Sequence, residues 1–141
     1  MRGASTGTAY LAALQSALAG EHAAVWACGR AAAELSRAQR TAALKELDAH
    51  RSARDELRRQ VVALGAEPVL AAVAYVEPFD VTGRAGGRRL LAHVDSALVA
   101  TYADLAGVTP QAGRRPVVAA ATESAVRALS WGADPAAFPG T

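Results

Sequence analysis

The feature that most constrains this chain is an apolar stripe with helical spacing whose centre is interrupted by charge. Small or apolar residues recur every three or four positions over residues 11–35, and Glu21 occupies the middle of this series. A second series covers residues 43–64 and places His50 and Arg54 near its centre. Such spacing is typical of helices that pack along a seam in a bundle. The two series therefore predict a helical bundle with polar side chains in its interior.

The composition fits a single helical domain. The chain has 141 residues, of which 52% are hydrophobic and only 5% are aromatic. The hydrophobic residues are mostly Ala, Leu and Val, which favours helix over sheet and supplies a core for one domain spanning residues 1–141. The formal net charge of +2 gives no reason to expect nucleic-acid binding. Cys28 is the only cysteine, so an internal disulfide and a cysteine-based metal knuckle are excluded, and we expect Cys28 to be a small buried hydrophobic residue.

The N-terminal segment lacks the features of a signal peptide or a membrane anchor. Gln15, Glu21 and His22 interrupt its apolar residues before they reach the length of a signal h-region or of a membrane span. We therefore expect a cytoplasmic protein that does not bind a membrane.

Turn and cap signals predict four helices joined by a short, a long and a short connection. The predicted helices cover residues 8–34, 37–64, 84–106 and 116–131. Ser36 and Gln39 match a capping box at the start of the second helix, and Pro116 suits the first position of the fourth. Residues 66–83 contain two prolines and several apolar residues, which predicts an extended crossover that packs onto the bundle surface.

This pattern predicts an all-α fold, namely a ferritin-like four-helix antiparallel bundle with a long crossover between helices 2 and 3. Gly65, Gly107 and Gly132 are expected to cap the ends of the second, third and fourth helices. Residues 1–7 and 133–141 are predicted to be irregular tails. The inward-facing stripe predicted for the fourth helix consists of Val118, Thr122, Ala125 and Leu129, with Val126 beside it and Glu123 at its edge.

Polar side chains near the midpoint of each predicted helix are expected to meet in one layer of the bundle. These residues are Glu21, His50, Asp95 and Glu123, with Arg54 one turn beyond His50. A buried carboxylate needs a partner, because an isolated charge in the core is prohibitively unstable. The favoured interpretation is a cluster of salt bridges and hydrogen bonds in which Glu21 contacts His50 and Arg54. Tyr102 is a further candidate partner.

A metal ion is the alternative partner for these side chains. Two-metal carboxylate centres use a Glu-x-x-His pair from each of two helices, and this sequence contains no such pair. A dinuclear oxidase or ferroxidase is therefore not expected. The remaining metal hypothesis is a single Fe, Mn or Zn ion held by Glu21, His50, Asp95 and Glu123. In the favoured interpretation the protein has no cofactor and no catalytic residues.

Several segments together give the chain a family resemblance. They are residues 14–25, 47–55, 64–68, 74–82, 100–105, 122–127 and 137–140. On these segments, which extend over nearly the whole chain, it resembles the actinobacterial ferritin-like domain family of unassigned function, DUF4439. The resemblance implies the four-helix ferritin-like fold and carries no assigned activity. The missing Glu-x-x-His pair separates the chain from true ferritins.

Three functions are compatible with these features. The first is a non-catalytic structural or interaction module that forms a homodimer through an Ala/Leu face. The second is a metal-binding protein or metal-dependent oxidoreductase of the ferritin-like superfamily with a degenerate site. The third is a small-ligand carrier that uses the bundle interior as a pocket. The sequence favours the first of these, and with it a protein that is not an enzyme.

Overall fold

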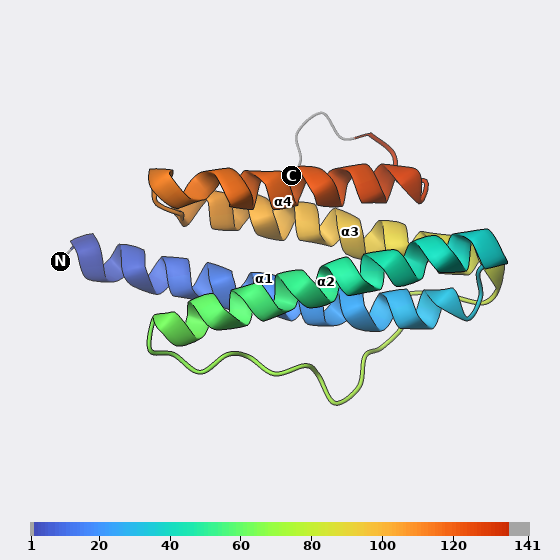
Figure 1. The fold of residues 1–141 in the computed structure, drawn as a ribbon, viewed down its shortest axis with the longest axis horizontal. Coiled ribbons are helices and arrows are strands. Elements are labelled where there is room, and N and C mark those ends of the chain that lie inside the picture. The colour runs from blue at the N-terminus through green and yellow to red at the C-terminus, as the bar shows by residue number, and fades with distance from the viewer. Residues whose placement is uncertain (1, 136–141) are drawn as a thin grey trace.

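A computed structural model describes residues 2–135, which form four α-helices (Figure 1). These are α1 (Arg2–Ala32), α2 (Arg37–Ala63), α3 (Gly83–Val108) and α4 (Gln111–Ser130). Within the described residues no strand is present. The predicted all-α class, with a long connection between the second and third helices, is confirmed. None of the helices in this part of the chain has both the length and the apolar character needed to span a membrane.

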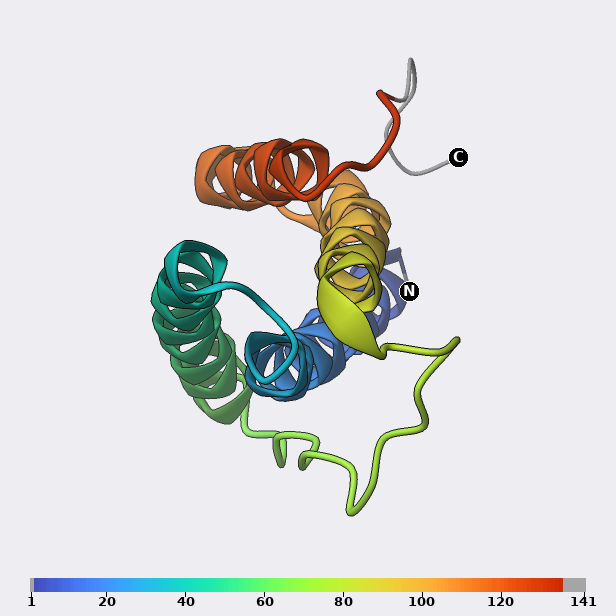
Figure 2. The same ribbon diagram turned by 90° about the vertical axis from the view of Figure 1, so that its right-hand side faces the viewer.

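The four helices form an open bundle. α1 packs against α2 and α3, and α3 packs in turn against α4. Figure 2 shows the resulting curved arrangement, with α2 and α4 at its two ends. The long crossover returns the chain to the end where α2 begins, so that α3 runs parallel to α2 (Figure 1). Among the described helices, α2 and α4 make no close backbone contact, and the side between them is open.

Local signals set the ends of α2 and α4. The Ser36 hydroxyl accepts a hydrogen bond from the backbone N–H of Gln39 at 3.4 Å, which confirms the predicted N-cap of α2. Gly65 has a φ of 74° and Gly132 has a φ of 103°. Both values lie in the left-handed region that favours glycine, and both residues follow the end of a helix as predicted. The predicted cap at Gly107 is wrong, because α3 continues to Val108 and Gly107 lies inside it.

The chain ends differ in part from the prediction. α1 begins at Arg2, so the predicted irregular tail is wrong for residues 2–7. No proline interrupts this stretch, and the helix extends through it. Residues 133–135 are irregular, as expected. The rest of the predicted C-terminal tail, residues 136–141, lies outside the described residues.

α4 is the helix that the sequence predicts least well. It begins at Gln111, directly after Pro110, so Pro116 lies inside the helix and not at its first position. The predicted inward stripe is wrong, because Val118 and Leu129 are exposed. The residues that turn inward are Val117, Ala120, Ala121, Ser124 and Ala128. Since α4 packs on α3 alone, a narrow face of small residues is enough to bring the two helices together.

The crossover is fastened along α1 by polar and aromatic contacts. The Gln15 side-chain amide accepts a hydrogen bond from the Val69 N–H at 2.8 Å. The Trp26 and Tyr75 rings stack with their centroids 5.2 Å apart. These contacts agree with a crossover that packs onto the bundle. Three of its apolar side chains nevertheless point into solvent, contrary to the prediction: Leu70, Val73 and Val76.

The crossover ends with a side chain inserted under the start of α3. Val81 is fully buried against the core. Its backbone lies so close to α3 that a Cβ on Gly86 would be 2.4 Å from the Val81 carbonyl carbon. Gly86 therefore permits the close approach between the crossover and the first turns of α3.

Replacing Gly86 with alanine should test this close approach. We expect Gly86→Ala to destabilise the protein by about 1–3 kcal/mol, because the added methyl group forces the Val81 backbone away. Gly107→Ala is the matched control, since nothing lies within 4 Å of a Cβ at that helical position. It should stabilise the protein by up to about 1 kcal/mol. Urea denaturation followed by circular dichroism measures both, and equal stabilities would contradict the proposed steric role.

Candidate functional site

Three ionisable side chains from three different helices meet in the core. Glu21 on α1, His50 on α2 and Asp95 on α3 are each exposed by 2% or less. The sequence-based expectation that these three positions share one layer is therefore correct. Burial of three such groups is costly unless they are paired, so their mutual contacts decide what the layer can do.

Glu21 is the best-satisfied member of the layer. Its Oε2 accepts a hydrogen bond from Nδ1–H of His50 at 2.7 Å. Its Oε1 accepts one from the Tyr102 hydroxyl at 2.5 Å. Burial, assisted by the Glu21 charge, raises the pKa of the Tyr102 hydroxyl and keeps it a donor. The carboxylate partner places a proton on His50 Nδ1, so Nε2 is the nitrogen that faces Asp95.

The opposite side of the layer has polar atoms without partners. Within the described part of the chain, His50 Nε2 and both Asp95 carboxylate oxygens are buried and make no hydrogen bond. Nε2 and Asp95 Oδ1 are 3.6 Å apart, which is too long for a hydrogen bond. Burial raises the pKa of the Asp95 carboxyl to about 7, and the nearby His50 opposes this effect only in part.

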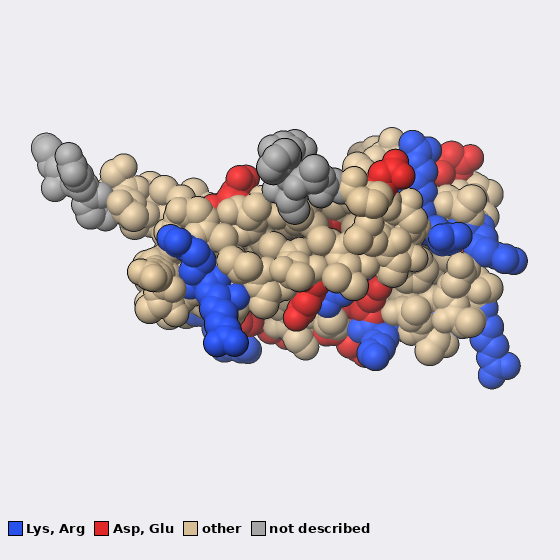
Figure 3. Space-filling model, turned by 90° about the horizontal axis from the view of Figure 1, so that it is seen from above, with Lys and Arg blue, Asp and Glu red and all other residues tan. Residues whose placement is uncertain are grey.

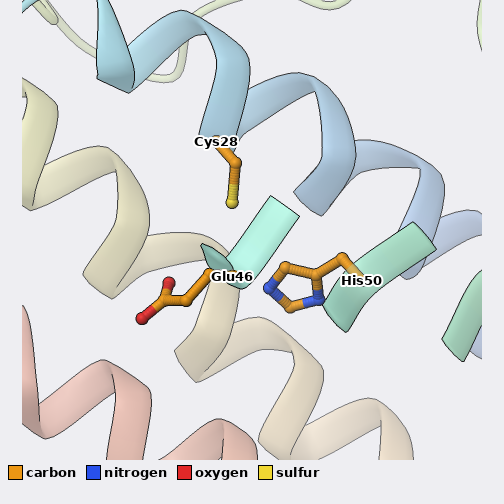
Figure 4. A group of neighbouring side chains, drawn as sticks. All are labelled: Cys28, Glu46 and His50. Atoms are coloured by element: carbon orange, nitrogen blue, oxygen red, sulfur yellow. The ribbon is translucent and has the colours of Figure 1, made fainter. Parts of the chain in front are cut away.

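A thiol and a second carboxylate lie beside His50 (Figure 4). Cys28 on α1 points into the space beside Glu46 and His50 on α2, and one ligand atom from each of the three lies within 4.8 Å of the other two. Cys28 is fully buried, and this burial raises the pKa of its thiol. Glu46 is half-buried, and both of its carboxylate oxygens accept the Nε1–H of Trp131 at 2.9 Å.

Helical spacing brings these donors together. Glu46 and His50 are four residues apart on α2, so they lie on the same face of the helix. Glu21 and Cys28 are seven residues apart on α1, which also places them on one face. Glu46 fails the Glu-x-x-His pattern, because Ala49 is the residue three positions after it, and it was therefore not among the predicted ligands. The Glu-x-x-x-His pair was the available signal.

Two predicted members do not join the buried cluster. Arg54 is partly exposed and its Nε donates to Asp55 at 2.9 Å, so the expected contact with Glu21 is replaced by a pair with its own neighbour. Glu123 has a side chain that is 67% exposed and faces Arg127 at 3.7 Å. The physical reason is the rotation of α4, which turns Ser124 inward and Glu123 outward.

Neutralising Glu21 should distinguish the buried cluster from the surface carboxylate. Glu21→Gln replaces the acceptor of two buried hydrogen bonds, and we expect it to destabilise the protein by about 3–5 kcal/mol. The matched control Glu123→Gln changes an exposed side chain and should alter stability by less than about 0.5 kcal/mol. Chemical denaturation measures both values. Similar losses of stability in the two variants would show that the buried cluster contributes no more to stability than the exposed carboxylate does.

The raised pKa of Asp95 makes the stability of the metal-free protein depend on pH. The unfolded carboxyl releases its proton near pH 3.8 and the folded one near 7, so the folded state binds more protons between these values. Stability from this group is therefore lost as the pH rises through that window. Asp95→Asn should gain stability relative to the parent by up to about 4 kcal/mol between pH 4 and 8. A pH-independent difference between the two proteins would contradict this.

Comparisons with known proteins agree with the fold and the family resemblance. No curated protein matches this chain. A crystal structure of a conserved hypothetical protein, rv2844, from Mycobacterium tuberculosis is similar, with 29% sequence identity and a TM-score of 0.85. The match covers 89% of this chain and 96% of that one. The family model for a domain of unknown function, DUF4439, matches residues 13–141. The chain therefore belongs to the DUF4439 family, whose function is unknown.

Proposed function

We propose that the core of the bundle binds a single divalent transition-metal ion. The ligands in this proposal are Cys28, Glu46 and His50, with Asp95 as a fourth ligand that faces His50 from α3. The observation that carries the proposal is that a thiol, a carboxylate and an imidazole lie within 4.8 Å of one another in the core, while His50 Nε2 and the two Asp95 oxygens are buried without a hydrogen bond. Buried polar atoms are nearly always paired, so a set of such atoms that converge on one place calls for a missing partner.

The spacing of the donors supports one shared ion. A tetrahedral site with metal–ligand bonds of about 2.1 Å separates neighbouring nitrogen and oxygen ligands by about 3.4 Å. The His50 Nε2 and Asp95 Oδ1 atoms are 3.6 Å apart, which is close to this value and beyond hydrogen-bond range. The Cys28, Glu46 and His50 ligand atoms lie within 4.8 Å of one another, whereas Asp95 is outside this group and would have to move toward Cys28 and Glu46 to share their ion.

Surrounding hydrogen bonds orient the proposed ligands. A metal-bound histidine usually donates its other ring N–H to a carboxylate, which fixes the tautomer and the ring direction. Glu21 has this position relative to His50, and Tyr102 in turn holds Glu21. On the other side, the Trp131 indole N–H holds the Glu46 carboxylate. In this proposal Glu21 supports a ligand, whereas the sequence-based hypothesis made it a ligand.

The donor set favours Zn²⁺ or Fe²⁺ over Mn²⁺. A thiolate and an imidazole suit zinc and iron, whereas manganese prefers carboxylate and water oxygens. Without metal, burial keeps protons on the Cys28 thiol and, below about pH 7, on the Asp95 carboxyl. Metal binding would release these protons, so the ion replaces them and compensates the charge of the ligands.

The proposal is tested with protein purified without a chelator. We expect about one Zn or Fe per chain by elemental analysis. After chelation, added Co²⁺ should give a thiolate-to-cobalt charge-transfer band. Cys28→Ser should abolish this band, and His50→Gln should abolish binding. Glu123→Gln, the matched control on the exposed face of α4, should keep both the metal content and the band.

Two results would overturn the metal hypothesis. One is parent protein that is folded by circular dichroism yet retains and takes up no Zn²⁺, Fe²⁺ or Co²⁺. The other is a Co²⁺ spectrum that is unchanged in Cys28→Ser. In either case the first hypothesis, a non-catalytic module with a buried hydrogen-bond cluster, would explain the core better.

The homodimer, the cytoplasmic location and the relation to ferritin-like proteins stay predictions. The exposed apolar side chains of α4, Val118, Val126 and Leu129, support a dimer. Figure 3 shows that the visible surface on this side of the molecule consists mostly of uncharged residues, which is compatible with such an interface.

A further inference from the structure

The open side of the bundle contains a groove that is separate from the candidate metal site. It has a volume of about 510 Å³, and residues of all four helices line it. This volume lies within the range of pockets that bind small organic molecules. The groove exists because α2 and α4 make no close contact over the described residues, whereas at their other end Trp131 and Glu46 connect them.

The walls of the groove are predominantly apolar. Leu57 on α2, Leu105 on α3 and Val117 on α4 contribute branched aliphatic side chains. Tyr102 also lines it, although it is only 4% exposed and its hydroxyl donates to Glu21. A surface made mostly of aliphatic groups favours apolar ligands.

The charged residues at the mouth of the groove limit which charge a ligand can have. Glu56 is the only charged residue among the described residues that line it. Its carboxylate is paired with Arg59 and accepts a hydrogen bond from Gln60. No lysine or arginine is among the described residues that line the groove, and the nearby Arg59 is already paired with Glu56. A fatty acid or another anion would therefore find no unpaired positive charge in the groove.

From this combination we infer that the groove binds a neutral, apolar small molecule. The ligand would lie between α2 and α4 with its apolar body against the aliphatic side chains that line the groove. The site does not depend on the proposed metal, because none of its lining residues is a proposed ligand. Tyr102 is the shared element, since it also holds Glu21 behind His50.

Two related fluorescent probes test both the site and its charge preference. N-phenyl-1-naphthylamine is neutral, and anilinonaphthalene sulfonate has the same ring system with an added negative charge. The neutral probe should increase in fluorescence with saturable binding, and the sulfonate should bind about tenfold more weakly or less. The titrations are done with metal-free and with Zn²⁺-supplemented protein, and binding is expected in both.

A matched pair of substitutions on α4 locates the binding site. Ala120 lines the groove, whereas the neighbouring Ala119 is exposed and does not line it. Ala120→Phe should fill the groove and weaken binding of the neutral probe by at least about tenfold. Ala119→Phe should leave binding unchanged. Circular dichroism and thermal denaturation confirm that both variants are folded.

Three outcomes would overturn the inference. The first is no saturable fluorescence increase with the neutral probe. The second is equal or tighter binding of the sulfonate. The third is a parent dimer in sedimentation that Ala120→Phe converts to monomer, because the groove would then be covered by a second copy of the chain. Failure of metal binding with intact probe binding would leave this inference standing.

Discussion

The hydrogen bond between Glu21 and His50 is the contact on which the rest of the core depends. It joins α1 to α2, fixes the imidazole ring, and gives the buried carboxylate one of its two partners. Tyr102 supplies the other partner from α3, so three helices are connected through one carboxylate. Because removing a partner from a buried ion pair leaves an uncompensated charge, this arrangement is sensitive to substitution even if its net contribution to stability is small.

The open shape of the bundle separates a polar region of the core from an apolar groove. Near one end of α2 and α4, Trp131 reaches Glu46 and encloses the polar donors. Toward the other end the two helices stay apart and leave the apolar groove. Tyr102 belongs to both regions, with its hydroxyl on the polar side and its ring on the apolar side. The same residue therefore connects the proposed metal site to the proposed ligand site.

Sequence reasoning predicted helices better than it predicted which face of each helix turns inward. The α2 seam is correct at Leu47, His50 and Leu57, because large apolar residues alternate with charged ones and the polar face is unambiguous. α4 lacks this contrast, since alanine and valine occur on several of its faces. The larger residues of α4 therefore predict the wrong inward face, which has Glu123 at its edge. In the structure Ser124 is buried instead.

By itself the sequence determined the four helices, the long crossover, and the presence of Glu21, His50 and Asp95 near one level. These follow from local spacing and from the turn residues between the helices. Only the tertiary structure decided which donors converge. Cys28 approaches Glu46 and His50 because α1 packs against α2, and α2 remains apart from α4 because each packs on a different neighbour. Such contacts depend on how helices are rotated and spaced relative to one another, and a local pattern does not encode that geometry.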